Sequence, residues 1–206
     1  MKDAVLLVRH TQVALRWQSR CYGRSDIGLS WTGAVHARDV AQSVADWRPD
    51  IVIHSGLKRA RILADHIARR SGLLALAMPF WQERDFGTWE GRSWAAIYRA
   101  TGNAMDGMID APTTFRPGGG ETTAELAQRA MAAFAALPNG RIAIITHGGP
   151  IAAIMGTING SPVRDWPSLV PQPGNTVQLM ASRGRWRTRH DSNVWPLPSE
   201  GSALSS

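Results

Sequence analysis

The stretch Val5-Leu6-Leu7-Val8-Arg9-His10-Thr11 decides the fold class of this chain. Its apolar residues predict a buried strand that delivers an arginine and a histidine at its carboxyl end. Near the other end of the chain, Ile142-Ala143-Ile144-Ile145-Thr146-His147-Gly148-Gly149 repeats the arrangement with a second histidine. Ligands of open α/β sheets bind at the carboxyl ends of parallel strands. We therefore expect Arg9, His10 and His147 to meet in one site, and their chemistry suits a phosphoryl group.

The composition indicates one globular domain. Of the 206 residues, 44% are hydrophobic and 19% are charged, which allows a substantial core and is unlike a disordered segment. No apolar run is long enough for a transmembrane helix, and Met1-Lys2-Asp3 leads directly into the first strand, without room for a cleavable signal peptide. Cys21 is the only cysteine, so no intrachain disulfide can form. We expect a cytoplasmic protein that has no membrane partner.

The charge of the chain suits an anionic partner. The formal net charge is +7, and a basic surface that only aids solubility is the alternative explanation. The arginines are dispersed rather than clustered, and the aromatic residues do not form the pattern of an RNA-binding sheet. We therefore expect a small phosphorylated substrate and no nucleic-acid partner.

Helical periodicity alternates with short apolar runs along the chain. The predicted helices cover residues 31–47 after Ser30, 57–71 before Gly72, 94–101 after Ser93, 123–137 after a Thr122–Glu125 capping box, and 150–158 from Pro150. Besides the first strand, the predicted strands cover residues 51–53, 74–78 and 142–146, and residues 177–180 and 186–188 form a hairpin. This alternation predicts a three-layer α/β/α fold with a mostly parallel central sheet. We expect a single domain over residues 1–195, with a small lid around 102–120 and a flexible tail over 196–206.

Four separated segments together form a motif set. They are Arg9-His10, Ser55-Gly56-Leu57-Lys58-Arg59-Ala60, the segment from Glu83 to Gly91, and Thr146-His147-Gly148-Gly149. In this order they closely resemble the signatures of the histidine phosphatase superfamily, also called phosphoglycerate-mutase-like. The resemblance spans roughly residues 4 to 180 and implies the fold of that family.

The resemblance implies a role for each residue of the set. It places the nucleophile at His10, which would form a phosphohistidine. Arg9 and Arg59 would grip the phosphoryl oxygens, and His147 would donate a further hydrogen bond to them. Glu83 would be the general acid for the leaving group. This chemistry needs no cofactor, and we expect no metal site.

One departure from the commonest family signature and one further segment point to a particular branch of the family. Thr11 stands where the commonest signature has glycine, and Cys21-Tyr22-Gly23-Arg24-Ser25-Asp26 follows it. The combination resembles the α-ribazole phosphatase branch, which implies α-ribazole 5′-phosphate, an intermediate of cobalamin synthesis, as the favoured substrate. By the same resemblance, Thr11, Tyr22, Gly23 and Gly148 are candidate substrate-binding residues. Cys21 has no identifiable partner base and is not expected to be a nucleophile.

The sequence leaves several functions open. A phosphoglycerate mutase would share the catalytic residues, but the short 102–120 stretch favours hydrolysis, because a mutase must retain the departing group while water is excluded. A phosphatase for another sugar or nucleotide phosphate is a further alternative. A phosphate-binding protein without activity is less favoured, since none of the catalytic residues is missing. The oligomeric state is also open, with a homodimer as one candidate.

Overall fold

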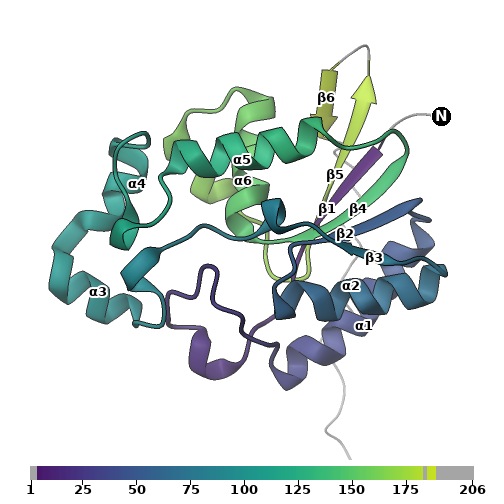
Figure 1. Ribbon diagram of the computed structural model, residues 1–206, viewed down its shortest axis with the longest axis horizontal. Helices are drawn as coiled ribbons and strands as arrows, with labels where there is room; N and C mark the ends of the chain where they lie inside the picture. Colours follow the sequence, from purple (N-terminus) through teal and green to yellow (C-terminus); the bar gives the residue numbers. More distant parts are fainter. Residues whose placement is uncertain (1–3, 183–184, 189–206) are drawn as a thin grey trace, which may run out of the picture.

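A six-stranded sheet lies at the centre of the molecule (Figure 1). The computed structural model describes residues 4–182 and 185–188; the expected flexible tail lies outside these residues. In the described part of the chain, the strands are β1 (Ala4–Arg9), β2 (Ile51–His54), β3 (Ala75–Ala77), β4 (Arg141–Thr146), β5 (Thr176–Ser182) and β6 (Arg185–Thr188). Their spatial order is β3-β2-β4-β1-β5-β6.

The register of the parallel strands brings their carboxyl ends together. β1 pairs with β4 so that Arg9 lies opposite Thr146, and β2 pairs with β4 so that His54 lies opposite Ile145. The residues that follow β1, β2 and β4 therefore share one edge of the sheet. β5 runs antiparallel to β1 and β6 antiparallel to β5, which confirms the predicted hairpin and the mostly parallel sheet.

Two pairs of helices cover the two faces of the sheet (Figure 1). α1 (Trp31–Asp46) and α2 (Lys58–Ser71) pack on one face, and α5 (Thr123–Ala135) and α6 (Gly148–Asn159) pack on the other. The side chains of β1 alternate between the two cores: Leu6 and Val8 join the cluster with α1 and α2, whereas Val5 and Leu7 join the cluster with α5 and α6. This arrangement confirms the three-layer prediction.

The predicted helix ends are mostly observed. The Ser30 hydroxyl accepts from Gly33 N at 2.9 Å and starts α1, and the Ser93 hydroxyl starts α3 (Trp94–Thr101) in the same way. Both bonds of the Thr122–Glu125 capping box are present at α5. Gly72 ends α2 in the left-handed conformation. These caps satisfy N–H and C=O groups that a helix cannot bond internally.

The start of α6 corrects the prediction. The helix begins at Gly148 rather than at Pro150, because His147 is extended and occupies the N-cap position. Pro150 is tolerated two residues further in, since the N–H groups of the first turn have no partner inside the helix. The earlier start places the first-turn N–H groups of α6 directly after His147.

The segment 102–120 is more ordered in secondary structure than a loop. It contains η4 (Gly102–Asp106), α4 (Gly107–Asp110) and η5 (Pro117–Gly119). Together with α3, this segment packs on a small separate core around Cys21, Trp89 and Ile97, to one side of the sheet (Figure 1). That core explains why short helices form where the glycines and prolines predicted irregular chain; the role of a lid stays a prediction.

Four further 3₁₀ turns connect the main elements. They are η1 (Leu15–Trp17), η2 (Pro79–Trp81), η3 (Gly87–Trp89) and η6 (Val163–Leu169). Among the described residues, no helix combines the length and the apolar character that crossing a bilayer would require.

Candidate active site

His10 lies at the carboxyl end of β1, and one of its ring nitrogens is hydrogen-bonded to the main chain. The side chain is 2% exposed, and its Nδ1 lies 2.7 Å from the main-chain oxygen of Thr11. Because a carbonyl oxygen can only accept, Nδ1 must carry a proton in this contact. In a neutral ring the lone pair is then on Nε2, which leaves Nε2 as the nucleophilic nitrogen.

The surroundings of His10 keep the ring neutral. Burial lowers the pKa of His10 well below its ordinary value, and the positive charges of Arg59 and Arg9 lower it further. The hydrogen bond to the Thr11 carbonyl acts in the opposite direction. The net result is a neutral imidazole at neutral pH, with its proton on Nδ1 and Nε2 free to act as the nucleophile.

His147 faces His10 across the sheet edge. The two ring centroids are 5.1 Å apart, and His147 Nε2 lies 2.8 Å from the Ser55 hydroxyl. That hydroxyl accepts from Leu57 N at 3.3 Å, so its own proton can be donated to Nε2. In that tautomer the His147 proton is on Nδ1, a buried atom without a hydrogen-bond partner among the described residues. His147 is therefore set to donate to a bound group.

Two arginines bring positive charge to the same place. Arg59 donates to the carbonyls of Gly23 at 2.6 Å and Ser25 at 2.7 Å, and Arg9 donates to the carbonyl of Pro171 at 2.6 Å. Within the described part of the chain, neither guanidinium forms an ion pair with a carboxylate, and the Nε of each is buried without a partner. Carbonyl groups orient the two cations without neutralising them, which leaves the site suited to an anion.

Glu83 approaches the site from the segment after η2. Its carboxylate accepts from Arg84 N at 2.9 Å and from Gly149 N, in the first turn of α6, at 3.2 Å. A Cβ at position 149 would overlap Glu83 Oε1. Gly149 therefore allows the carboxylate to reach the same helix terminus that follows His147.

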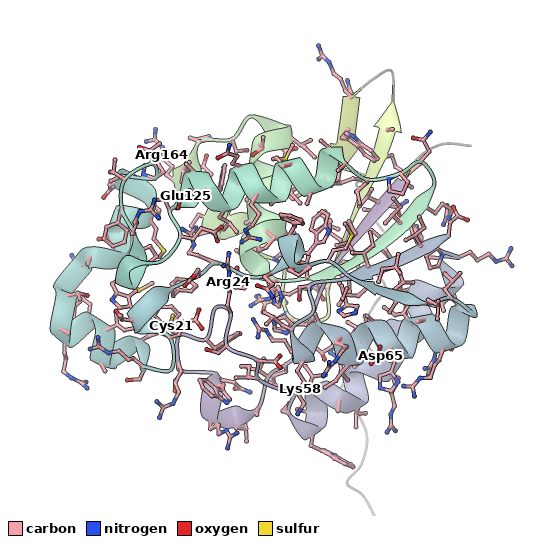
Figure 2. The ribbon with its side chains drawn as sticks, viewed as in Figure 1. Cys21, Arg24, Lys58, Asp65, Glu125 and Arg164 are labelled. Atoms are coloured by element: carbon pink, nitrogen blue, oxygen red, sulfur yellow. The ribbon has the colours of Figure 1, made fainter. Side chains whose placement is uncertain are left out.

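A second network fixes the main chain that carries Glu83. From α5, Arg129 donates to the carbonyls of Phe80 at 2.6 Å and Gln82 at 3.0 Å, and it pairs bidentately with Glu121 at 2.8 Å for both bonds. In Figure 2, Arg24 reaches from the 21–26 loop toward this network, where it lies 3.5 Å from Glu121. Charge-assisted hydrogen bonds thus link three parts of the chain: the segment that carries Glu83, α5 and the 21–26 loop.

The candidate substrate-binding residues have different surroundings. Tyr22 lies under the Arg59 guanidinium, with the Arg59 Cζ 5.1 Å from the ring centroid. A Cβ at Gly148 would lie 3.5 Å from Arg9 Cζ. Gly23 supplies its carbonyl to Arg59 and leaves no room for a Cβ beside Glu90. All three positions therefore adjoin the arginines.

Thr11 is used differently from what its motif suggested. Its side chain is fully buried, and its hydroxyl donates to the Gly33 carbonyl of α1 at 2.7 Å. The threonine thus ties the end of β1 to α1, and only its main chain is free to shape the site. Packing thus accounts for a threonine at this position, and a substrate-binding role for Thr11 stays a prediction.

Two residues of the 21–26 loop, Cys21 and Asp26, have contacts that indicate structural roles. Cys21 is buried, and burial together with nearby Glu90 and Glu83 raises the pKa of its thiol to about 12. This is consistent with the expectation that Cys21 is not a nucleophile. Asp26 accepts from Lys58 N at 2.5 Å and so bonds the first turn of α2, which carries Arg59.

A cavity of about 270 Å³ opens beside His10. The residues that line it are Arg9, His10, Gln12, Val13, Gln18, Tyr22, Gln172 and Pro173. The loop that contributes Gln172 and Pro173 lies just before β5, far in sequence from the motif set.

The sequence prediction omitted several residues of this site. Ser55 and Gly149 were parts of motifs without an assigned role, although each bonds a candidate catalytic side chain directly. In the sequence, Arg129 is only a polar position in a predicted helix, and nothing there indicates a role in the site. Gln172 had one signal, because Pro171-Gln172-Pro173-Gly174 is a turn sequence just before a predicted strand.

Known proteins resemble this chain over most of its length. Residues 5–193 match the model of the histidine phosphatase superfamily (branch 1). An uncharacterized phosphatase, PhoE, of Bacillus subtilis is 34% identical over 76% of this chain and 78% of its own length. Glucosyl-3-phosphoglycerate phosphatase of Mycobacterium tuberculosis is 29% identical over 91% of this chain and 88% of its own length.

Solved structures share the fold. The mycobacterial glucosyl-3-phosphoglycerate phosphatase superposes with a TM-score of 0.82 at 26% identity, covering 92% of this chain and 98% of that one. The α-ribazole phosphatase of Shigella flexneri superposes with a TM-score of 0.80 over 90% of this chain and 94% of that one. Its identity is only 20%, so this likeness concerns the fold alone.

Two of the buried histidines, His10 and His147, predict a pH-dependent stability. Below pH 6.5 the unfolded chain binds a proton at each histidine, whereas the folded protein, whose pKa values for His10 and His147 are lowered, does not. The free energy of unfolding should therefore fall as the pH drops below 6.5, by up to about 1.4 kcal/mol per histidine between pH 7.5 and 5.5. Urea denaturation in phosphate-free buffer at both pH values measures it. His10→Gln should reduce the difference by about one histidine's share, and an unchanged difference would contradict the burial argument.

Proposed function

Because the chain belongs to the histidine phosphatase superfamily (branch 1), we propose that it is a phosphomonoesterase that acts through a phosphohistidine at His10. The observation that carries the proposal is the state of this ring. Its Nδ1 is bonded to the Thr11 carbonyl, which leaves Nε2 free beside two guanidinium groups without carboxylate partners. A phosphoryl group supplies the negative charge that this arrangement lacks.

In the first step, His10 Nε2 attacks phosphorus while the bond between phosphorus and the ester oxygen breaks. Arg9 and Arg59 stabilise the charge on the phosphoryl oxygens, and His147 Nδ1–H donates a further hydrogen bond. The first-turn N–H groups of α6 add to the same positive field. The carbonyls that hold the arginines keep the groups oriented before substrate arrives, so little reorganisation is needed.

Glu83 completes both steps as acid and then as base. In its protonated form it donates a proton to the departing alkoxide, which leaves as an alcohol. It then takes a proton from the water that attacks phosphorus, the P–N bond breaks, and inorganic phosphate and neutral His10 are released. The contacts from Arg84 N and Gly149 N keep the carboxylate aimed at the site throughout.

Within this reaction we propose α-ribazole 5′-phosphate as the favoured substrate. Support comes from Thr11 and the 21–26 motif, and from the place of Tyr22, whose ring lines the cavity and can pack on a base or ribose. Glucosyl-3-phosphoglycerate is the competing substrate, because a relative named for it covers nearly the whole chain.

The test of the phosphohistidine is label transfer. After brief mixing with a ³²P-labelled phosphomonoester and alkaline quench, the protein should carry label, and His10→Ala should carry none because the attacking nitrogen is gone. His66→Ala, on α2 and away from the site, serves as the matched control and should be labelled normally. Label on the His10→Ala protein would refute the assignment.

The test of Glu83 is the dependence on the leaving group. Glu83→Gln should lower turnover of alkyl phosphates by ~10²–10⁴-fold, the usual scale for loss of general acid–base catalysis. The rate at which p-nitrophenyl phosphate phosphorylates the enzyme should fall far less, since nitrophenolate departs without a proton. Equal losses with both substrates would show that Glu83 supports the fold of the site rather than proton transfer.

The test of the substrate is a panel assayed with chelator present. Release of inorganic phosphate is measured from α-ribazole 5′-phosphate, glucosyl-3-phosphoglycerate, mononucleotides and sugar phosphates, and 3-phosphoglycerate is assayed with a bisphosphate primer. We expect the highest kcat/KM for α-ribazole 5′-phosphate. Similar slow rates on every substrate would leave a broad-specificity phosphatase, and strong isomerisation with little hydrolysis would indicate a mutase.

A further inference from the structure

Three glutamines surround the entrance to the cavity beside His10. Gln12, Gln18 and Gln172 line it together with the ring of Tyr22. Arg9 is the single arginine or lysine that lines it within the described residues, and no aspartate or glutamate does. Since Arg9 belongs to the phosphoryl end, the remaining residues that line the cavity include no side chain with a full charge.

Gln12 presents its amide nitrogen. Its Oε1 accepts from the hydroxyls of Thr32 at 2.9 Å and Ser30 at 3.4 Å, both at the start of α1. These contacts fix the oxygen, and the Nε2 group has no hydrogen-bond partner among the residues that the structure describes. Gln12 is thus oriented as a donor to a ligand.

Gln18 presents the opposite group. Its Nε2 donates to the Val13 carbonyl at 3.2 Å, so its Oε1 remains to accept. Gln12 and Gln18 therefore offer a donor and an acceptor to the same cavity, which suits a hydroxyl group that both donates and accepts.

Gln172 is held in place by a tight turn. Asn175 N donates to the Gln172 carbonyl at 3.0 Å, and Gly174 has a φ of +89°, as in a type II turn with Pro173 at its second position. Gly174 N in turn donates to the carbonyls of Arg9 and His10 at 3.1 and 3.2 Å. The turn is therefore fastened to the end of the strand that carries the nucleophile.

Carboxamides select against charge in the leaving group. A neutral amide can bond a hydroxyl well, but it offers no opposite charge to a carboxylate or a second phosphate. We infer that Gln12, Gln18 and Gln172 form a subsite for an uncharged, hydroxyl-bearing leaving group, which selects sugar or polyol phosphates over phosphorylated acids and bisphosphates. The inference rests on the proposed phosphomonoesterase reaction and adds the substrate class.

The sharpest test uses a pair of substrates that differ only at the relevant position. Glycerol 3-phosphate and 3-phosphoglycerate share their skeleton, but the first ends in a hydroxymethyl group and the second in a carboxylate. For the full-length protein, kcat/KM should favour glycerol 3-phosphate by at least about tenfold. An equal or reversed preference overturns the subsite.

Variants of Gln172 test whether the subsite sets the preference between substrates independently of phosphoryl transfer. Gln172→Ala should lower kcat/KM for glycerol 3-phosphate about threefold to tenfold, the scale of a lost neutral hydrogen bond. Gln172→Lys should shift the ratio of the two substrates at least about tenfold toward 3-phosphoglycerate. Turnover of p-nitrophenyl phosphate, whose ring has no hydroxyl, serves as the reference, and Gln172→Ala should lower it less than it lowers turnover of glycerol 3-phosphate. Gln128→Lys, exposed on α5, is the control for a general increase in positive charge and should leave the ratio unchanged.

The outcomes distinguish the two proposals. Absence of hydrolysis of every substrate, p-nitrophenyl phosphate included, would reject the phosphomonoesterase reaction itself. Normal hydrolysis of p-nitrophenyl phosphate with an unshifted ratio in Gln172→Lys would reject the subsite and leave the reaction standing. A shift of the same size in Gln128→Lys would also reject it, since long-range charge would then explain the change.

Discussion

The site depends on positive charge that the protein orients but does not neutralise. Arg59 is fully buried, and its bonds to main-chain carbonyls satisfy two of its nitrogens without supplying an opposite charge. Burying such a charge is costly, and burial indeed lowers the pKa of the Arg59 guanidinium. Burial lowers the pKa values of His10 and His147, and the same cations lower them further. The positive charge that favours an anion thus also adds to the effect of burial in keeping the nucleophile neutral.

This constraint explains why the loops around the site are tied so firmly. The carbonyls that hold Arg59 belong to the 21–26 loop, and Glu90 fixes that loop by accepting from Arg24 N at 2.8 Å and the Ser25 hydroxyl at 2.6 Å. The carbonyl that holds Arg9 belongs to Pro171, beside the turn that carries Gln172. Segments that are distant in sequence must be in place before either guanidinium is satisfied. The charged site is therefore complete only when these loops are in their folded positions.

The sequence predicts the centre of the site far better than its surroundings. His10 and His147 follow apolar strands, and the carboxyl ends of parallel strands meet in any sheet of this class, so their convergence follows from pattern alone. The roles of Arg59 and Glu83 came from the motif set, since neither follows a strand directly. Arg129 could not be predicted, because its bonds to the carbonyls of Phe80 and Gln82 depend on how α5 is placed over the sheet. The 102–120 helices were missed because a small tertiary core outweighs the local turn signals.

Specificity is less predictable than catalysis for a physical reason. A phosphoryl group presents the same oxygens in every substrate, so the residues that bind it follow a recurrent motif, whereas the leaving group meets side chains whose orientation is set by local contacts. Gln12 and Gln18 are the same residue type, yet one presents a donor and the other an acceptor, because Thr32 and the Val13 carbonyl engage opposite ends of their amides. No sequence pattern distinguishes these two states. They are distinguished only by the folded contacts of each side chain, which for Gln12 come from the start of α1 and for Gln18 from Val13 in its own segment.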